Sequence, residues 1–269
     1  MALKVANRGD VPVFLALQTL RQATALEKTG KEILHLEIGQ PFDGAPKAAL
    51  ENLSKCMQAD PIAYTEALGI RPLRERIADM YATRYGVQVP VERIAITVGS
   101  STAFVLSFLA AFEPGDRVAL ATPCYPAYRN ILLAQGLVPV EIPCNADTQF
   151  QPTVEMLDNL DEPIVGLILA SPANPTGGML KPDEFEALIH WCRDNHVRLI
   201  SDEIYHGITF GGVASSALES TDDAVVINSF SKYFALSGWR IGWMILPPDL
   251  LEPIEKLAQS FYISAPAMS

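Results

Sequence analysis

The sequence predicts an α/β protein whose mostly parallel central sheet is covered by helices on both faces. From Ile94 onward, short runs rich in aliphatic and β-branched residues alternate with helical segments of about a dozen residues, the pattern of βαβ units. Of the 269 residues, 49% are apolar and 19% are charged, a globular composition that supplies a large core. The chain has no internal repeat and no low-complexity linker.

The elements before Ile94 are less regular. Residues 11–29 carry apolar side chains at helical spacing and end at Gly30, so we expect a helix there. The short apolar run Ile33–Ile38 is expected to form a strand. Gly69–Arg84 has the pattern of an amphipathic helix with Pro72 in its first turn, where the missing N–H removes no hydrogen bond.

The alternating elements then follow in order. The expected strands are Ile94–Val98, Arg117–Ala121, Val138–Ile142, Ile164–Ala170, Arg198–Ser201, Ala224–Ser229 and Gly242–Leu246. The expected helices are Thr102–Phe112, Pro126–Gln135, Pro152–Leu160, Lys181–Asn195 and Pro248–Ser260. In an open sheet of this kind ligands bind beyond the carboxyl ends of the strands, so residues directly after strands are the candidates for a site.

Charge, hydropathy and cysteine usage exclude several classes of protein. Twenty Lys and Arg against 31 Asp and Glu give a net charge of −11, which argues against a nucleic-acid partner. The longest nearly apolar stretches, Ala103–Phe112 and Ile164–Ala170, are far shorter than the ~18 residues of a membrane span, so we expect no membrane partner. The four cysteines show no CxxC spacing, and no histidine is placed to complete a zinc-ligand pattern with them, so we expect reduced thiols in a cytoplasmic protein without a metal site.

Clusters of polar residues follow successive strands. Gly99–Thr102 opens a helix and can present N–H groups and hydroxyls to an anion, although an N-cap is the simpler interpretation. The loop Ser171–Gly178 contains two prolines and two glycines, more than a plain turn requires. Asp202 ends a buried strand, where a carboxylate needs a cationic partner. Lys232 and Arg240 follow the next strand, although a lone lysine in such a place is usually solvated.

One ligand satisfies all of these clusters. It presents an anionic group to the serines and Arg240, and a cationic ring atom to Asp202. It also offers an oxygen to Asn174 and Tyr205, and a carbonyl group that Lys232 can attack. Pyridoxal 5′-phosphate has these features, and a lysine Schiff base with an acidic partner for the pyridine nitrogen is typical of that cofactor.

Three motifs carry a resemblance to a known family. Asn174-Pro-Thr-Gly177, Ser201-Asp-Glu-Ile-Tyr205 and Ser229-Phe-Ser-Lys232, with Arg240 eight residues further on, resemble class I/II (fold-type I) pyridoxal-phosphate-dependent aminotransferases, and more narrowly the aspartate and aromatic aminotransferase subgroup. The separations, 28 residues from Asn174 to Asp202 and 30 from Asp202 to Lys232, match the family pattern. The similarity runs from Glu37 to Pro266, nearly the whole chain.

The resemblance also implies a domain organisation. Residues 46–269 correspond to the cofactor-binding large domain, and residues 1–45 to an N-terminal arm and part of a small domain. Family members continue well beyond the motif Ile263–Pro266, so we expect the C-terminal remainder of the large domain and the rest of the small domain to be missing. For residues 1–269 alone we expect weakened cofactor binding and little or no transamination.

The resemblance implies three catalytic residues. Lys232 would hold the cofactor as an internal aldimine and then move the proton between the substrate Cα and the cofactor C4′, which requires a neutral amine with a lowered pKa. Asp202 would keep the pyridine nitrogen protonated. Tyr205 would hydrogen-bond the phenolate oxygen together with Asn174.

It implies binding residues as well. The phosphate would be held by Gly99, Ser100, Ser101, Ser229, Ser231 and Arg240. Tyr125 would stack on the pyridine ring, and Tyr64 would reach the phosphate of the partner subunit in a homodimer with shared active sites. Gly39 and Asn174 would bind the substrate. The four histidines, His35, His190, His196 and His206, are interpreted as structural or surface residues.

The function implied is transfer of an amino group from an L-amino acid to a 2-oxo acid by a ping-pong mechanism. A carbon–sulfur β-lyase or a cyclopropane-forming synthase uses the same cofactor residues, because substrate orientation decides which bond breaks. An effector-sensing domain of a transcription regulator is a third alternative, but the residues before the first motif lack a helix-turn-helix pattern. Neither Arg71 nor Arg74 matches the family's carboxylate-binding arginine, so donor and acceptor stay open.

Overall fold

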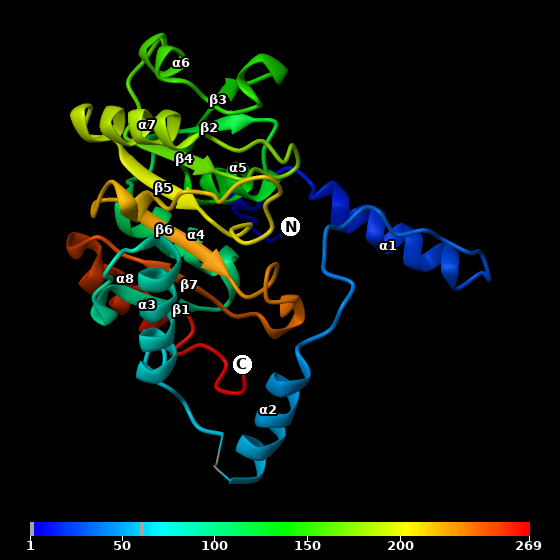
Figure 1. Cartoon of the computed structure of the whole chain (residues 1–269). Helices are drawn as coiled ribbons and strands as arrows, with labels where there is room; N and C mark the ends of the chain where they lie inside the picture. Colours follow the sequence, from blue (N-terminus) through cyan, green and yellow to red (C-terminus); the bar gives the residue numbers. More distant parts are fainter. Residues whose placement is uncertain (1–2, 60–61) are drawn as a thin grey trace.

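A seven-stranded sheet with the strand order β1-β7-β6-β5-β4-β2-β3 forms the centre of the computed structural model, which describes residues 3–59 and 62–269 (Figure 1). The strands are β1 (Ile94–Thr97), β2 (Arg117–Thr122), β3 (Val138–Pro143), β4 (Gly166–Ala170), β5 (Arg198–Asp202), β6 (Val225–Ser229) and β7 (Gly242–Ile245). β7 runs antiparallel to both neighbours, and the other pairings are parallel. This confirms the predicted, mostly parallel sheet.

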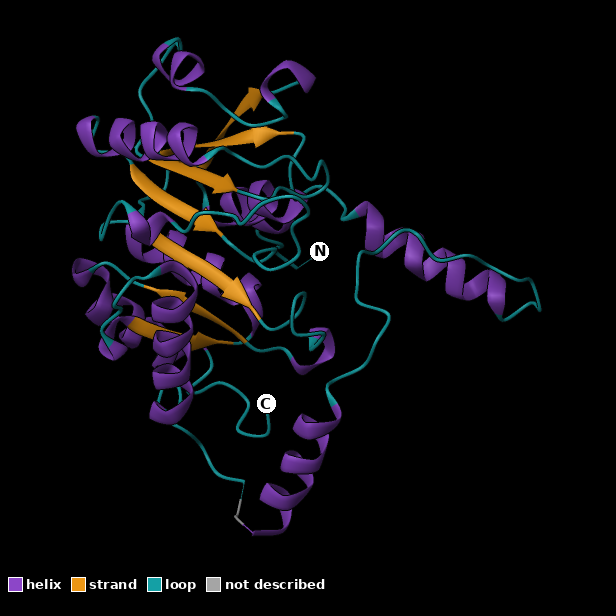
Figure 2. Cartoon of the chain, viewed as in Figure 1, coloured by secondary structure: helices purple, strands orange, loops and turns teal. Residues whose placement is uncertain are grey.

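Helices cover both faces of the sheet (Figure 2). One face packs against α3 (Arg71–Tyr85), α6 (Val154–Asp158) and α7 (Pro182–Asp194), and the other against α4 (Gly99–Ala111), α5 (Pro126–Gln135) and α8 (Leu251–Phe261). The strands alternate accordingly: in β4, Leu167 and Leu169 belong to the first core and Ile168 to the second. Glycines in the left-handed conformation follow two of these helices, Gly86 after α3 and Gly136 after α5.

The N-terminal region differs from its prediction in two places. The expected strand at Ile33–Ile38 does not form: Leu34 and Leu36 are 84% and 92% exposed, and no strand of the sheet pairs with them. A strand needs a partner for its backbone groups, which the apolar pattern alone does not supply. A helix that was not predicted, α2 (Lys47–Ala59), lies in the segment that follows.

Helix α1 (Leu15–Glu27) projects away from the layered body (Figure 1). Ala23 is its one buried residue. The chain before α1 nevertheless contacts α5, because Asn130 Nδ2 donates to the Pro12 carbonyl at 2.8 Å. The ring of Phe14 meets Tyr125 edge-on, with 5.7 Å between ring centroids. The arm therefore starts beside the carboxyl end of the sheet, while the domain boundary at residue 45 stays a prediction.

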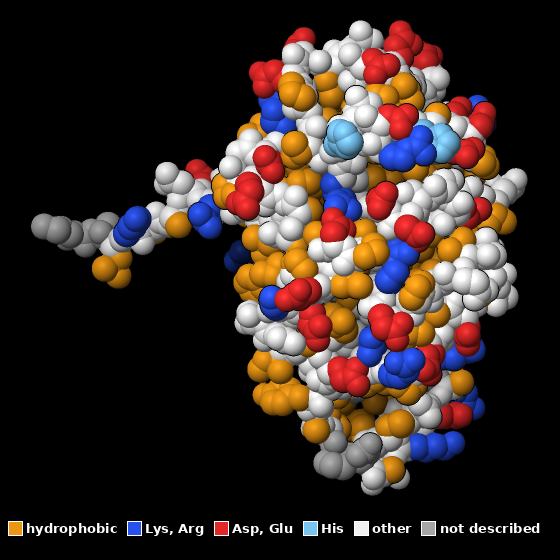
Figure 3. All heavy atoms as spheres, turned by 90° about the vertical axis from the view of Figure 1, so that its left-hand side faces the viewer, with side chains coloured by type: hydrophobic (Ala, Val, Ile, Leu, Met, Phe, Trp, Pro, Cys, Tyr) orange, Lys and Arg blue, Asp and Glu red, His pale blue; other side chains and the backbone are white. Residues whose placement is uncertain are grey.

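The surface, the helices and the cysteines give three further observations. Acidic and basic side chains are interspersed on the face drawn in Figure 3. Within the described parts of the chain, no helix has the length and apolar character needed to cross a bilayer. None of the four cysteines forms a disulfide in the described structure.

Candidate active site

The carboxyl edge of the sheet brings the predicted residues together. β4, β5 and β6 run in parallel, with Ala170 opposite Asp202 and Asp202 opposite Ile227, so the segments that follow these strands leave the sheet side by side. β7 runs in the opposite direction, which places the segment before it, with Arg240, at the same edge. Topology therefore gathers residues that are far apart in sequence.

A cavity of about 170 Å³ lies at this edge. The predicted residues that line it are Ser100, Ser101, Tyr125, Asn174, Asp202, Tyr205, Ser231, Lys232 and Arg240. A larger hollow of about 660 Å³ lies on another part of the surface, and its one ionisable lining residue, Lys181, is paired with Glu184. The smaller cavity is therefore the candidate active site.

Lys232 follows β6 and lies between the arm and the sheet edge. Its Nζ donates to the Gly39 carbonyl and lies 5.9 Å from the centroid of the Tyr205 ring. Burial and the nearby Arg240 lower the pKa of this amine, and the Asp202 carboxylate partly opposes them. The lysine therefore has the lowered pKa that a nucleophile or base requires.

Asp202 ends β5 and is 4% exposed. Tyr128 donates its hydroxyl to Oδ2, and the Ile204 N–H donates to Oδ1 at 3.1 Å. Burial raises the pKa of this carboxyl to about 6, although both hydrogen bonds and Lys232 lower it. Among residues 3–59 and 62–269, no Lys or Arg forms an ion pair with Asp202. A cationic ligand atom would supply the partner that a buried carboxylate needs.

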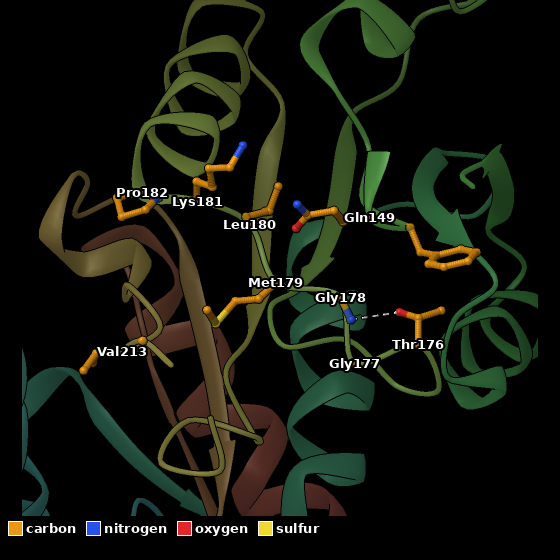
Figure 4. A pocket seen from close by; sticks show the side chains of 11 residues that line it. Gln149, Thr176, Gly177, Gly178, Met179, Leu180, Lys181, Pro182 and Val213 are labelled. Carbon is orange, nitrogen blue, oxygen red and sulfur yellow. Dashed lines mark hydrogen bonds between the residues drawn. The ribbon is translucent and has the colours of Figure 1, made fainter. Parts of the chain in front are cut away.

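The loop after β4 aims Asn174 at the same cavity. Asn174 Nδ2 donates to Tyr205 Oη at 3.3 Å. The far side of the loop is closed by hydrogen bonds, including one of 3.2 Å from the Gly178 N–H to the Thr176 hydroxyl (Figure 4). Two polar groups from neighbouring strands thus converge on one side of the cavity.

An anion-binding cradle lies at the start of α4. Ser100 and Ser101 occupy the first turn of this helix, where free N–H groups and the helix dipole favour a negative group. Ser231 and Arg240 complete the cavity wall. Arg240 lies against Gly99, which has no side chain in its way. Ser229 is fully buried behind this wall, with Oγ 2.8 Å from Ser231 Oγ, and supports the cradle from the inside.

Two predicted residues behave differently from the rest. Tyr64 is 81% exposed and is absent from the cavity lining, so this chain alone does not bring it to the site. Gly39 reaches the site through its carbonyl group, which accepts from Lys232.

Sequence analysis missed several lining residues, among them Gln40, Ser237 and Tyr128. Tyr128 is 3% exposed and bonds to Asp202 across 74 positions of sequence. The one available signal was its position three residues after Tyr125, at the start of a helix that follows a strand end.

The chemistry of these side chains fits pyridoxal 5′-phosphate. A buried carboxylate without an ion pair fits a protonated ring nitrogen, and an amine with a lowered pKa fits a carbonyl carbon. A helix N-terminus with serines and an arginine fits a phosphate group. No lining residue conflicts with such a ligand.

The sheet order and this lysine-centred site define the class of protein, a fold-type I transferase. The family model for aminotransferase class I and II matches residues 31–269, and the chain belongs to this family. The protein is therefore an aminotransferase.

Similar proteins agree with this assignment. A valine–pyruvate aminotransferase from Mycobacterium tuberculosis is 44% identical over 271 residues, which cover 100% of this chain and 70% of the relative. The crystal structure of an aminotransferase from the same organism superposes with a TM-score of 0.97 at 43% identity, covering 99% of this chain and 70% of the other. An aspartate aminotransferase from Thermus thermophilus with maleate gives a TM-score of 0.94 at 25% identity, covering 99% and 71%.

Proposed function

We propose that this protein uses pyridoxal 5′-phosphate to move an amino group from an L-amino acid to a 2-oxo acid by a ping-pong mechanism. The observation that carries the proposal is the placement of Lys232 and Asp202 in one cavity, an amine with a lowered pKa and a buried carboxylate that forms no ion pair with a Lys or Arg of the described chain. When bound, the cofactor supplies a carbonyl carbon that amines attack and a protonated ring that accepts electrons from the Cα–H bond.

The side chains of this protein have separate tasks in the proposed reaction. Lys232 Nζ would hold the cofactor covalently through its carbonyl carbon and, as a free amine, would take the proton from the substrate Cα and give it to that carbonyl carbon. Asp202 keeps a proton on the ring nitrogen. Asn174 and Tyr205 bind the ring oxygen, and the cradle of Ser100, Ser101, Ser231 and Arg240 fixes the phosphate. Two substrates use the site in turn, which is ping-pong kinetics.

We further propose that the protein works as a homodimer with shared active sites. Tyr64 supports this, because its exposed ring is free to reach the cradle of a partner subunit. The relative named valine–pyruvate aminotransferase makes L-valine and pyruvate the first donor and acceptor to test.

The test is a single half-reaction with the cofactor in excess and a long incubation, because weakened cofactor binding and slow transamination are expected for residues 1–269 alone. The chain is incubated with pyridoxal 5′-phosphate and then with L-valine or another amino acid, and absorbance, 2-oxo acid and ammonia are measured. Amino transfer predicts one 2-oxo acid per site and no ammonia, and Lys232→Ala is the inactive control. Release of ammonia and pyruvate from a substrate with a β-leaving group would instead establish the β-lyase alternative.

A further inference from the structure

A buried histidine next to the site makes contacts that the proposed reaction does not use. His206 follows Tyr205 directly and is 3% exposed. Its Nε2 lies 3.0 Å from the Ser171 carbonyl, and its Nδ1 lies 2.7 Å from the hydroxyl of Tyr85, near the end of α3. His206 therefore connects three parts of the chain, the end of α3, the turn after β5 and the loop after β4.

The hydrogen bonds determine the tautomer of this ring. A carbonyl oxygen only accepts, so Nε2 must carry the proton that is donated to Ser171. Nδ1 is then the acceptor for the Tyr85 hydroxyl. Burial lowers the pKa of His206 to about 4, which keeps the ring neutral near pH 7 and agrees with this assignment.

The buried carboxyl group of Glu203 lies beside His206 but does not form a hydrogen bond with it. It lies 3.6 Å from Nδ1, beyond hydrogen-bond distance, and accepts instead from Ser216 Oγ at 2.9 Å and from the Ala217 N–H at 2.9 Å. Its bonds to Ser216 and Ala217 leave the Tyr85 hydroxyl as the hydrogen-bond partner of Nδ1. The hydrogen bonds to Tyr85 at Nδ1 and to Ser171 at Nε2 therefore determine the orientation of the imidazole ring.

The bond to Ser171 joins the two segments that carry cofactor-facing groups. Ser171 lies three residues before Asn174, and its own hydroxyl accepts from the Leu180 N–H at 2.9 Å, which closes the loop. Tyr205, one residue before His206, meets Asn174 through the 3.3 Å hydrogen bond. Moving the His206–Ser171 contact would change the distance between these two groups.

We propose that His206 is a positioning residue, which rests on the proposed function: by donating to the Ser171 carbonyl while accepting from Tyr85, it holds Asn174 and Tyr205 at the spacing needed to bind the cofactor ring oxygen together. His206 does not line the cavity and contacts no reacting atom itself.

Nuclear magnetic resonance of the cofactor-free chain is the first test. Nitrogen-15 spectra at pH 7 are expected to show His206 protonated at Nε2, and protonation at Nδ1 would overturn the proposal. His206→Leu is expected to shift the side-chain amide signal of Asn174, and an unchanged signal would also overturn it. Neither readout depends on cofactor chemistry. A failure of the proposed function is recognised separately, because the wild-type chain would then not bind pyridoxal 5′-phosphate.

Cofactor affinity and the absorption spectrum are the second test. His206→Leu is expected to weaken pyridoxal 5′-phosphate binding about tenfold and to shift the pH midpoint of the bound chromophore, since Ser171 loses its donor. His206→Gln, whose amide can still donate, is expected to restore affinity to within about threefold of wild type. A loss of affinity in His206→Leu that only follows the loss of folded protein, with an unchanged spectrum of the bound chromophore, would show a merely structural role and overturn the proposal.

A tyrosine pair on α3 provides a matched control that avoids large changes in packing. Tyr85→Phe removes the hydroxyl that bonds to His206 from a partly buried ring, and Tyr81→Phe removes one from a fully buried ring a turn earlier, whose hydroxyl is not bonded to His206. Only Tyr85→Phe is expected to shift the chromophore midpoint. Equal shifts in both variants, or none in either, would contradict the proposal.

Discussion

The guanidinium of Arg240 lies directly against the Cα of Gly99, so that a Cβ at Gly99 would be 3.0 Å from Cζ and closer still to Nη2. Gly99 has a φ of +72°, a conformation that favours glycine, and it begins α4. The missing side chain therefore serves two purposes, the turn into the helix and the approach of the arginine to the anion cradle.

Gly99→Ala is expected to displace Arg240 and to weaken phosphate and pyridoxal 5′-phosphate binding by about tenfold or more, because a charge-assisted partner is lost. Gly86→Ala is the matched control, since Gly86 has a φ of +71° and open space around it. Both variants are expected to lose about 1–2 kcal/mol of stability from backbone strain. Isothermal titration checks the affinities, and an equal loss of affinity in both variants would disprove the specific role of Gly99.

Asp202→Asn is expected to stabilise the cofactor-free chain in a pH-dependent way. Burial raises the pKa of Asp202 from 3.8 to about 6, so the folded state resists ionisation and loses stability as the pH rises through this window. The substitution removes this cost, a gain of up to roughly 3 kcal/mol at pH 8 and clearly less at pH 5. Urea unfolding at the two pH values measures it, and a gain that does not change with pH would contradict the assignment.

Asp202→Asn is also expected to slow the amino-transfer half-reaction while leaving the shape of the cavity unchanged. Asparagine cannot hold a proton on the ring nitrogen, so the half-reaction should slow by about a hundredfold or more. Stopped-flow absorbance with saturating amino acid is the measurement. An unchanged rate would remove Asp202 from the proposed reaction.

Glu203→Gln is expected to remove a loss of stability between pH 6.5 and pH 8. Burial raises the pKa of Glu203 from 4.5 to about 8, so the wild-type fold loses stability as the pH rises toward 8, by up to about 1.4 kcal/mol per pH unit. His206, with its pKa lowered from 6.5 to about 4, acts in the opposite direction only below pH 6.5. Thermal unfolding from pH 6.5 to 8 should therefore be flatter in the variant, whereas Glu113→Gln, at an exposed acid that follows α4, should keep the wild-type slope.

Mixing two inactive variants tests whether the sites are shared between subunits. Tyr64→Ala lacks the proposed partner contact, and Lys232→Ala lacks the covalent attachment. If Tyr64 serves the neighbouring subunit, refolded mixtures should regain high-affinity trapping of cofactor at about a quarter of the wild-type level, because half of the dimers are mixed and carry one complete site. No recovery in verified mixed dimers would place Tyr64 outside the partner's site.

The sheet topology explains why the candidate residues gather at one edge, and tertiary contacts account for the lining residues that sequence analysis missed. Asp202 ends a strand, and Asn174, Lys232 and Arg240 follow or precede strands, so a correct sheet already brings them to one edge. Tyr128 was missed because its link to the site is a hydrogen bond to Asp202, which lies 74 positions away in the sequence.

Two elements near the N-terminus show the same limit. The run Ile33–Ile38 has the apolar pattern of a strand but finds no partner, and α2 forms although none of its residues is buried. Pairing and burial are properties of the whole fold, and a short window of sequence does not contain them.

Covalent trapping at Lys232 is the most direct test of the central claim. The chain is incubated with pyridoxal 5′-phosphate, reduced with borohydride and digested, and the modified peptide is identified by mass spectrometry. The account predicts one cofactor per chain on Lys232, loss of this label in Lys232→Ala, and release of the cofactor from Lys232 when an amino acid is added before reduction. Labelling spread over surface lysines, or label on Lys232 that amino acids do not release, would contradict it.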